Sequence, residues 1–308
     1  DVTWITDIGQ PFVFTTPKEA KVVGNEIWVS DQVADAIHRF DFDRNYLSSI
    51  TAHFNAGALL DNLRGFGIHG SNVYLTIDPS NNANSGVVAY DFAGTPTGYF
   101  PGVPAGASLF DIAPFGKELL ISNSTTDDIE RYSPAGAFLG TFQTNLDFPQ
   151  QVDALPDGTI IAVATIGAAG NEGVYHWNPD GSLIRYIDTE GLKVAFGEHV
   201  PHAAWPLEDG NYLIASSTGV YKYDVAGNSF SEILGDVDGQ YINPIDLTPA
   251  PCPADVDDSG SVDVDDLVAV ILGWGDCPKP PASCDADIDD SGAVDVDDLV
   301  AVILGWGD

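Results

Sequence analysis

Apolar and polar positions alternate in short runs through residues 1–249, and no helical period is sustained there for a dozen residues. Alternation over about five residues predicts β-strands that are covered on one face. Polar turns such as "PDGT" (156–159) separate the runs and place Gly where a positive φ is needed. The predicted strands include 26–30, 73–77, 119–122, 159–164 and 212–215. This part of the chain is therefore predicted to be an all-β domain.

One short phrase recurs five times in this domain, each time with an aromatic residue near its end. The copies are "IHRFD" (37–41), "VVAYD" (87–91), "IERYS" (129–133), "VYHWN" (174–178) and "VYKYD" (220–224). Their aromatic residues lie 50, 42, 45 and 46 residues apart, and four strands in about 45 residues is the period of a propeller blade. Preceded by strands of the "EIWVSD" kind, the phrase resembles that of NHL-type and related six-bladed β-propellers.

We predict six blades, with five as the alternative. The segments that could form innermost strands are 19–23, 65–69, 109–114, 151–155, 203–207 and 244–248, and only the first five precede a full set of outer strands. The N-terminal "DVTWITD" resembles "NEIWVSD", so we expect it to complete a composite sixth blade built from both ends of the domain. Closing the ring in this way would leave no open sheet edge.

Residues at the starts of inner strands line the central channel of such a fold. The resemblance extends to six-bladed lactonases and related hydrolases, which hold Ca²⁺ there with Glu, Asn and Asp so that the ion polarises the substrate carbonyl. The channel candidates are Glu19, Asp111, Asp153, His202 and Asn243, together with Arg64, Gln151, His199 and Asp246. Every propeller lines its channel with polar groups, however, and no Ser-His-Asp order, His-rich metal spacing or Gly-rich phosphate loop is present. We therefore favour structural lining over catalysis and assign no catalytic residue.

Acidic residues outnumber basic ones by 46 to 11, which gives a net charge of −35. The last 57 residues hold 15 Asp and one Lys, so the rest of the chain is also strongly acidic. Such a surface repels nucleic acid and anionic membranes and suits divalent cations. No run approaches eighteen apolar residues, so no membrane insertion is expected.

The sequence contains no Met, and its three cysteines lie among prolines in the last 57 residues. We therefore expect a mature protein from which a signal peptide has been removed. Cysteines in this context are typical of an oxidising compartment. The expected location is extracellular or at the cell surface.

Two twelve-residue stretches, "DVDDSGSVDVDD" (255–266) and "DIDDSGAVDVDD" (287–298), place oxygen-bearing residues at alternating positions. A Gly turn at position six and a backbone carbonyl at position seven complete the set that a hard, seven-coordinate cation needs. Two loops in one register, 32 residues apart, favour two Ca²⁺ sites over a solvated acidic face. The expected ligands are Asp255, Asp257, Ser259, Ser261 (carbonyl), Asp263 and Asp266 for one ion, and Asp287, Asp289, Ser291, Ala293 (carbonyl), Asp295 and Asp298 for the other.

Each loop leads into the same apolar stretch, "VDDLVAVILGWG", which predicts a helix that packs the pair of loops together. A duplicated loop–helix with Asp at position twelve and no preceding helix resembles the type I dockerin, and "GWGDC" resembles its Cys-containing variant. The resemblance covers 252–308, with repeats at 252–276 and 284–308, and implies calcium-coupled folding and docking through the helix faces onto a cohesin domain. Positions ten and eleven are Val264/Asp265 and Val296/Asp297 rather than Ser or Thr, which leaves another copy of the same protein as an alternative partner.

Together these patterns predict a propeller at 1–249 and a dockerin-like domain at 250–308. The favoured function is a non-catalytic, extracellular, calcium-dependent binding or assembly protein. Its connector would attach the propeller to a partner, or to further copies of itself in a filament. The alternative is a secreted propeller hydrolase, lactonase or lyase displayed through the same connector.

The three cysteines cannot all pair within one chain. Cys252 and Cys284 occupy the same place in the two repeats, and Cys277 directly follows the first "GWGD". Repeat symmetry predicts a Cys252–Cys277 disulfide, with Cys277–Cys284 as the competing pair. By the same symmetry, the natural chain is expected to continue past Asp308 with a partner for Cys284.

Overall fold

The computed structural model divides the chain by its internal contacts into two compact units, Asp1–Asp246 and Leu247–Asp308. The described residues of the first unit are 5–51, 60–78, 85–104, 106–166, 171–197 and 200–245. Those of the second are 254–257, 259, 262–277, 284, 286–288 and 291–306. Across these ranges, no helix is both long enough and apolar enough to cross a membrane.

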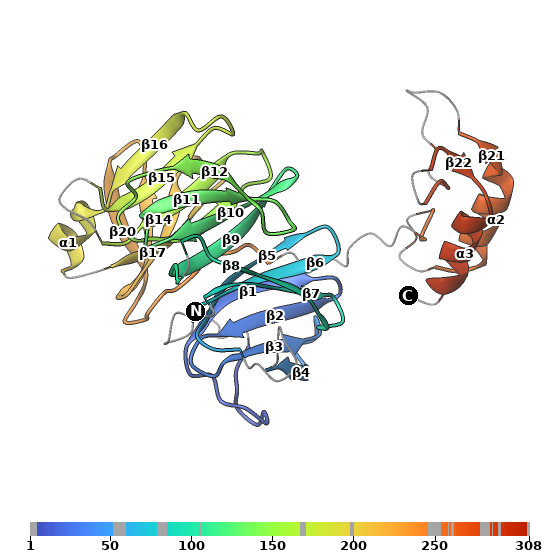
Figure 1. Ribbon diagram of the computed structural model, residues 1–308, viewed down its shortest axis with the longest axis horizontal. Helices are drawn as coiled ribbons and strands as arrows, with labels where there is room; N and C mark the ends of the chain where they lie inside the picture. Colours follow the sequence, from blue (N-terminus) through green and yellow to red (C-terminus); the bar gives the residue numbers. More distant parts are fainter. Residues whose placement is uncertain are drawn as a thin grey trace. The chain divides into compact units, whose positions relative to one another are not determined.

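The first unit is a β-propeller, as predicted, and its described residues form five four-stranded antiparallel blades (Figure 1). Blade 1 consists of β1 (Pro17–Val23), β2 (Glu26–Asp31), β3 (Ala36–Phe40) and β4 (Tyr46–Ile50). Blade 2 consists of β5 (Leu63–His69), β6 (Asn72–Ile77), β7 (Gly86–Asp91) and β8 (Pro96–Pro101). Blade 3 is β9 (Leu109–Phe115), β10 (Glu118–Asn123), β11 (Asp128–Tyr132), β12 (Phe138–Gln143). Blade 4 consists of β13 (Pro149–Ala154), β14 (Ile160–Ala164), β15 (Gly173–Trp177) and β16 (Leu183–Asp188). Blade 5 consists of β17 (Pro201–Pro206), β18 (Tyr212–Ser216), β19 (Gly219–Asp224) and β20 (Ser229–Gly235). Helix α1 (Glu190–Phe196) lies between blades 4 and 5 in the sequence.

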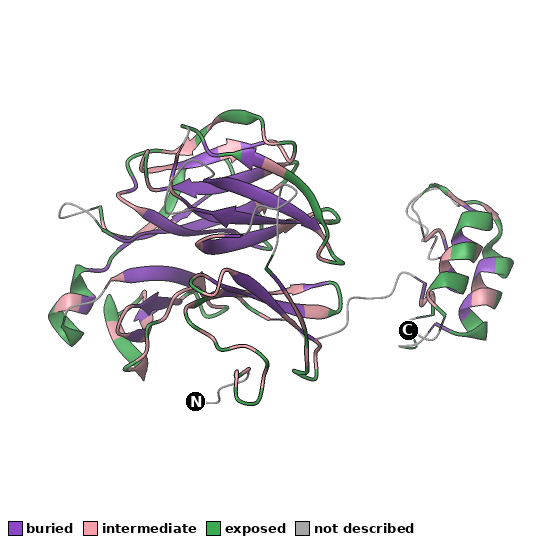
Figure 2. Cartoon of the chain, turned by 60° about the horizontal axis from the view of Figure 1, so that its bottom comes forward, coloured by how far each residue is buried: buried purple, intermediate pink, exposed green. Residues whose placement is uncertain are grey.

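The buried residues of the first unit lie mainly on the strands of its blades (Figure 2), and apolar side chains pack between neighbouring blades. One buried cluster joins blade 1 to blade 2, and three more join blades 2 and 3, 3 and 4, and 4 and 5. Trp28 and Phe66, both fully buried, belong to the first of these clusters. Because burying one large apolar side chain contributes about 1.5–3 kcal/mol, these four cores account for much of the propeller's stability.

The prediction of a composite sixth blade is wrong. Residues 5–7, the described part of the expected strand "DVTWITD", form no strand, and neither do residues 8–14. Instead, the ring of Phe12 stacks on His38 at 3.8 Å and lies 6.0 Å from Phe40, so the segment around Phe12 covers an outer part of blade 1.

The junction between blade 5 and blade 1 is made by residues 236–245, which we call the closing segment. On the blade 5 side, the N–H of Gly239 donates to the Ser216 carbonyl at 2.9 Å. On the blade 1 side, Lys18 donates to the Gln240 side chain, and Asn243 donates to Glu19 at 3.0 Å. The closing segment thus takes the place of the predicted sixth inner strand (244–248), of which only 244–245 are described and are not β-structure.

The second unit contains α2 (Val264–Gly273), α3 (Val296–Leu304) and a two-stranded pair, β21 (Gly275–Asp276) and β22 (Ala293–Val294). Each helix begins with a capping box, formed by Asp263 and Asp266 in α2 and by the corresponding residues in α3. The helices were predicted from their apolar spacing. In the two-stranded pair, Val294 of the second loop lies opposite Gly275, which follows the first helix.

The disulfide is Cys277–Cys284, so the predicted Cys252–Cys277 bridge is corrected in favour of its competitor. The N–H of Cys277 donates to the Gly292 carbonyl at 3.0 Å, which ties the end of the first repeat to the second loop. This pairing brings the Cα atoms of Cys277 and Cys284 to 5.7 Å, within the range that a disulfide spans. Cys252 lies outside the described residues.

Candidate functional sites: the propeller channel and the acidic loops

In each of the five blades, the first strand (β1, β5, β9, β13 or β17) is the innermost. Its pairing with the second strand of the blade is interrupted one or two residues after the first strand begins. A bulge of this kind turns a side chain away from its usual direction. The equivalent residues at this position, in blade order, are Glu19, Gly65, Asp111, Gln151 and Ala203, each of which directly precedes the residue that pairs two positions before the end of the second strand. Three of these five residues had been predicted to line the channel, and His202 lies one residue before this position in blade 5.

The side chains at this position link each blade to the next. Glu19 accepts a hydrogen bond from the N–H of Phe66 in blade 2 at 2.5 Å, and Asp111 accepts one from Val152 in blade 4 at 3.0 Å. Gln151 likewise accepts one from blade 5 at 3.2 Å. At Gly65 an added Cβ would lie 2.0 Å from the Asp111 carboxylate, so only Gly leaves room for that carboxylate.

Lys21 provides the positive charge in the channel. Its ammonium lies 2.7 Å from Glu19 and 3.6 Å from Asp153, and it donates to the Phe66 carbonyl at 2.7 Å. Burial raises the pKa of Glu19, of Asp153 and, most strongly, of Asp111. Burial would lower the pKa of Lys21, but the surrounding carboxylates outweigh it and raise that pKa. Lys21 was not identified from the sequence, because a lone Lys on a strand carries no distinctive pattern.

Tyr241 of the closing segment is the other channel residue that sequence reasoning missed. Its hydroxyl donates to the Phe110 carbonyl at 3.2 Å. Burial, together with the charges of Asp111 and Glu19, raises the pKa of Tyr241 well above its usual value. Nothing in the phrase "GQYINP" distinguishes this tyrosine from one in an exposed loop.

The remaining channel candidates also have protein partners. His202 shares a hydrogen bond with the Gly239 carbonyl at 2.9 Å. Arg64 forms an ion pair with Asp78 at 2.7 Å, and its guanidinium lies 3.6 Å from the centre of the Phe110 ring. His199 and Asp246 lie outside the described residues. The channel residues therefore form an internal network in which an ammonium occupies the centre of the carboxylates, an arrangement that does not fit a resident divalent ion.

The first acidic loop of the second unit has a different arrangement. Single carboxylate oxygens of Asp255, Asp257 and Asp266 all lie within 4.8 Å of one another. Asp266 is fully buried and accepts from the N–H groups of Val256 at 2.6 Å and of Asp263 at 2.8 Å. Burial would raise the pKa of Asp266, but these N–H groups outweigh it and lower that pKa. The loop is thus folded around converging anionic oxygens.

The second loop repeats this frame. Asp298 is fully buried and accepts from Ile288 at 2.6 Å and from Asp295 at 2.7 Å. Asp287 accepts from the N–H of Ser291 at 2.9 Å, as Asp255 does from Ser259 in the first loop. Two predicted ligands, Ser261 and Asp289, lie outside the described residues. A further cluster, formed by Asp287 and the two bridged cysteines, offers no thiolate because both sulfurs are in the disulfide.

Each helix after a loop buries one face and exposes an apolar one. Val270 and Val302 are fully buried in the core of the unit. The exposed apolar side chains occur at matching positions in the two repeats. They are Val264, Val268, Ile271, Leu272 and Trp274 in the first, and Val296, Val300, Ile303, Leu304 and Trp306 in the second. Leu272 and Leu304 are 81% and 80% exposed, and exposed apolar patches of this kind mark interaction surfaces.

Comparison with solved structures shows the propeller fold. A gluconolactonase from Xanthomonas campestris is 15% identical with a TM-score of 0.57, over 75% of this chain and 80% of that one. A protein of unknown function from Bacteroides caccae is 14% identical with a TM-score of 0.54, over 71% and 81%. Another from Bacteroides thetaiotaomicron is 15% identical with a TM-score of 0.50, over 77% and 65%. No protein-family model and no curated protein matches the sequence.

Proposed function

We propose that this protein is an extracellular docking protein, in which a rigid propeller is carried by a calcium-dependent connector. The observation that carries this proposal is the convergence of Asp255, Asp257 and Asp266 in a loop whose frame is repeated around Asp298. A disulfide-bonded chain is typical of an oxidising compartment outside the cytoplasm, where calcium is present at about millimolar concentration. Weak extracellular modules bind calcium in about that range.

Calcium would supply the positive charge that the second unit lacks. Residues 247–308 contain one Lys and no Arg or His against 15 Asp. The ions would be held by the side chains predicted above, with Asp255, Asp257 and Asp266 as the described core of the first set. Because such ligands must be deprotonated and repel each other when empty, ion binding and folding of this unit are coupled.

The exposed apolar faces of α2 and α3 would be the docking surface. Since the two helices share one sequence, the unit presents the same set of five exposed apolar residues twice. The partner would be a cohesin-like domain or a second copy of this chain, and repeated head-to-tail self-contact would give a filament.

The alternative, a secreted hydrolase or lactonase, receives less support from the channel. The likeness to a gluconolactonase, at 15% identity, concerns the fold. The carboxylates that could hold a catalytic ion are bound to Lys21 and to backbone N–H groups. Hydrolysis of aldonolactones by the intact protein in calcium would revive this alternative.

The docking proposal is tested by light scattering of the size-fractionated full chain, alone and with a panel of cohesin domains, in calcium and in EGTA. We expect calcium-dependent self-association or capture of a cohesin. The variant Leu272→Asp with Leu304→Asp should bind no partner while still binding two calcium ions. A wild-type protein that stays monomeric at high concentration and captures no cohesin would refute the proposal.

A further inference from the structure

One position of the repeated phrase is occupied differently in blade 2. The residue before the phrase's aromatic is long in four blades and short in one. In blade order it is Arg39, Ala89, Arg131, His176 and Lys222. Because the strands keep the same register, these side chains lie at equivalent places on the third strand of each blade.

In the four other blades this long side chain reaches back to a polar residue at or before the start of the second strand. The contacts are Arg39–Glu26 at 2.7 Å, Arg131–Glu118 at 2.7 Å, His176–Thr159 at 2.8 Å and Lys222–Asp209 at 2.7 Å. In blade 1 the guanidinium also lies over the Trp28 ring, 5.2 Å from its centre. The side chain therefore covers the surface of the second strand.

Blade 2 lacks both members of this pair. Asn72 stands where blades 1 and 3 have Glu26 and Glu118, and Ala89 stands in place of the cation. The Asn72 side chain instead accepts from Thr97 at 3.0 Å. Tyr74, which is the counterpart of Trp28, is consequently not covered by a cation.

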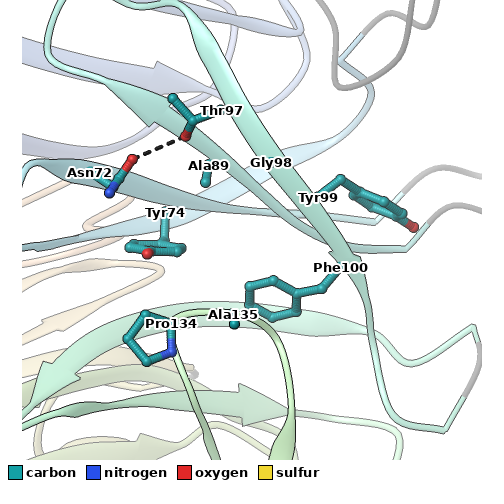
Figure 3. Close-up of a pocket in the computed structure, with 9 residues that line it drawn as sticks. All are labelled: Asn72, Tyr74, Ala89, Thr97, Gly98, Tyr99, Phe100, Pro134 and Ala135. Carbon is teal, nitrogen blue, oxygen red and sulfur yellow. Dashed lines mark hydrogen bonds between the residues drawn. The ribbon is translucent and has the colours of Figure 1, made fainter.

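The result is a hollow of about 380 Å³ between blades 2 and 3 (Figure 3). Its lining comes from Asn72, Tyr74, Ala89, Thr97, Gly98, Tyr99 and Phe100 of blade 2 and from Pro134 and Ala135 of blade 3. Across its floor Ala89 pairs with Gly98, where an added Cβ would touch only Ala89, at 3.9 Å. The volume lies in the range of small-molecule sites.

The walls of the hollow are fixed before any ligand arrives. Phe100 stacks on Tyr132 with ring centres 5.7 Å apart, and both side chains are buried. The backbone of Gly136 approaches so closely that an added Cβ would lie 2.4 Å from Phe100. Preformed walls reduce the ordering that a ligand must impose on binding.

The lining favours a neutral ligand with several polar groups. None of its nine residues is charged, so neither a cation nor an anion would find a counter-charge there. The Tyr74 hydroxyl has no hydrogen-bond partner among the described residues, and the Asn72 and Thr97 side chains add further polar groups at the rim. A pyranose ring combines an apolar face with neutral hydroxyls, and we propose that this pocket binds one pyranose ring of a neutral saccharide.

The proposal is tested on the full chain in calcium with an array of neutral and anionic glycans, followed by calorimetric titration with the neutral glycan that binds best. Ala89→Arg combined with Asn72→Glu would restore the ion pair of the other blades and fill the hollow. We expect this variant to keep the wild-type melting temperature and to bind at least about tenfold more weakly, which corresponds to 1.4 kcal/mol. Tyr74→Phe, which removes only the hydroxyl, should weaken binding by about two- to tenfold.

The matched control is Lys222→Ala with Asp209→Asn, which removes the corresponding ion pair from blade 5 and should leave saccharide binding unchanged. The proposal is overturned if no neutral glycan binds, if anionic glycans bind at least as tightly, or if the refilled variant binds as the wild type does. These outcomes do not depend on whether the second unit docks to a partner.

Discussion

Both units of this chain bury carboxylates, but they balance that charge in different ways. In the propeller channel, the Lys21 ammonium lies 2.7 Å from Glu19, and backbone N–H groups bind the Asp111 carboxylate. In the second unit, Asp266 and Asp298 are fully buried within acidic loops, and the sequence offers that unit one Lys and no Arg. Under the proposed function, the propeller needs no further cation, whereas folding of the second unit depends on calcium from solution.

The apolar core of the propeller is also larger than that of the second unit. Four clusters join the propeller blades, and they include large side chains such as Trp28 and Phe66. Among its described residues, the second unit has six buried apolar side chains, all Ala or Val. Units of about 60 residues with small cores usually need a metal, disulfides or a partner to remain folded. Under the proposed function, this chain combines a domain stabilised by packing with a domain stabilised by calcium.

The largest expected effect is loss of one metal site. Asp266→Ala removes a converging oxygen and the acceptor for three backbone N–H groups. We expect calcium stoichiometry, measured by calorimetric titration, to fall from two ions to one. The control is Asp265→Ala, at the exposed neighbouring position, which should leave two ions bound. Retention of both ions by Asp266→Ala would show that this loop does not hold calcium through position twelve.

The next effect is on the propeller. Lys21→Met leaves Glu19, Asp111 and Asp153 buried without their cation, and removing one partner of a buried charge network typically costs about 3–5 kcal/mol. Chemical denaturation should show this loss in the propeller transition. Lys193→Met, which breaks a half-exposed pair with Glu172, should cost less than about 1 kcal/mol. Equal losses for the two variants would contradict the role assigned to Lys21.

A smaller effect is expected at Gly65. In Gly65→Ala the new Cβ would lie 2.0 Å from the Asp111 carboxylate and 3.0 Å from its Cα, so the inner strands must move. Overpacking of this kind costs about 1–3 kcal/mol. Gly98→Ala is the matched control, since its Cβ meets one atom at ordinary contact distance, and it should change stability by less than about 0.5 kcal/mol. A larger loss of stability in Gly98→Ala than in Gly65→Ala would mean that the inter-blade network around Asp111 is not tightly packed.

The smallest effect is the pH dependence, which should have opposite signs in the two units. Burial raises the pKa of Glu19, Asp111 and Asp153 above the unfolded values of about 4. The folded propeller therefore binds more protons than the unfolded chain, and its stability falls as pH rises from about 4 through the raised pKa values. The lowered pKa of Asp266 acts oppositely: its contribution is present above about pH 4 and is lost as pH falls below that.

Thermal unfolding in calcium between about pH 2.5 and 8 would compare the two slopes. Asp111→Asn should flatten the slope of the propeller transition, and Asp43→Asn, at an exposed turn, should leave it unchanged. A propeller transition whose slope is the same in all three proteins would mean that the channel carboxylates do not titrate in this range.

The sequence predicted the propeller because its aromatic phrase and turn residues recur with the period of a blade. It misled on the blade number, because "DVTWITD" and the segment near Pro244 resemble strands locally. Which segments pair depends on tertiary contacts: after "DVTWITD" the chain packs on blade 1 through the stacking of Phe12 on His38, and the closing segment hydrogen-bonds to blades 1 and 5. A strand-like sequence indicates that a segment can pair in a sheet, but it does not indicate which strand lies close enough to pair with it.

The loop ligands and the channel residues differ in how far their positions can be predicted from the sequence. The loop ligands were predictable because their spacing follows a twelve-residue pattern along the chain. Lys21 and Tyr241 were not, since they meet Glu19 and Asp111 only through the ring of blades. The disulfide likewise follows contacts between the repeats, through Gly292 and Cys277, that repeat symmetry alone does not contain.

Differential scanning calorimetry of the full chain, in calcium and in excess EGTA, tests most directly whether the two units are stabilised in different ways. We expect two transitions in calcium. In EGTA, the transition of residues 247–308 should disappear, while the propeller transition should keep its temperature within a few degrees. Limited proteolysis would identify which unit has unfolded. A second unit that melts at the same temperature and resists protease equally with and without calcium would contradict the claim that calcium stabilises it.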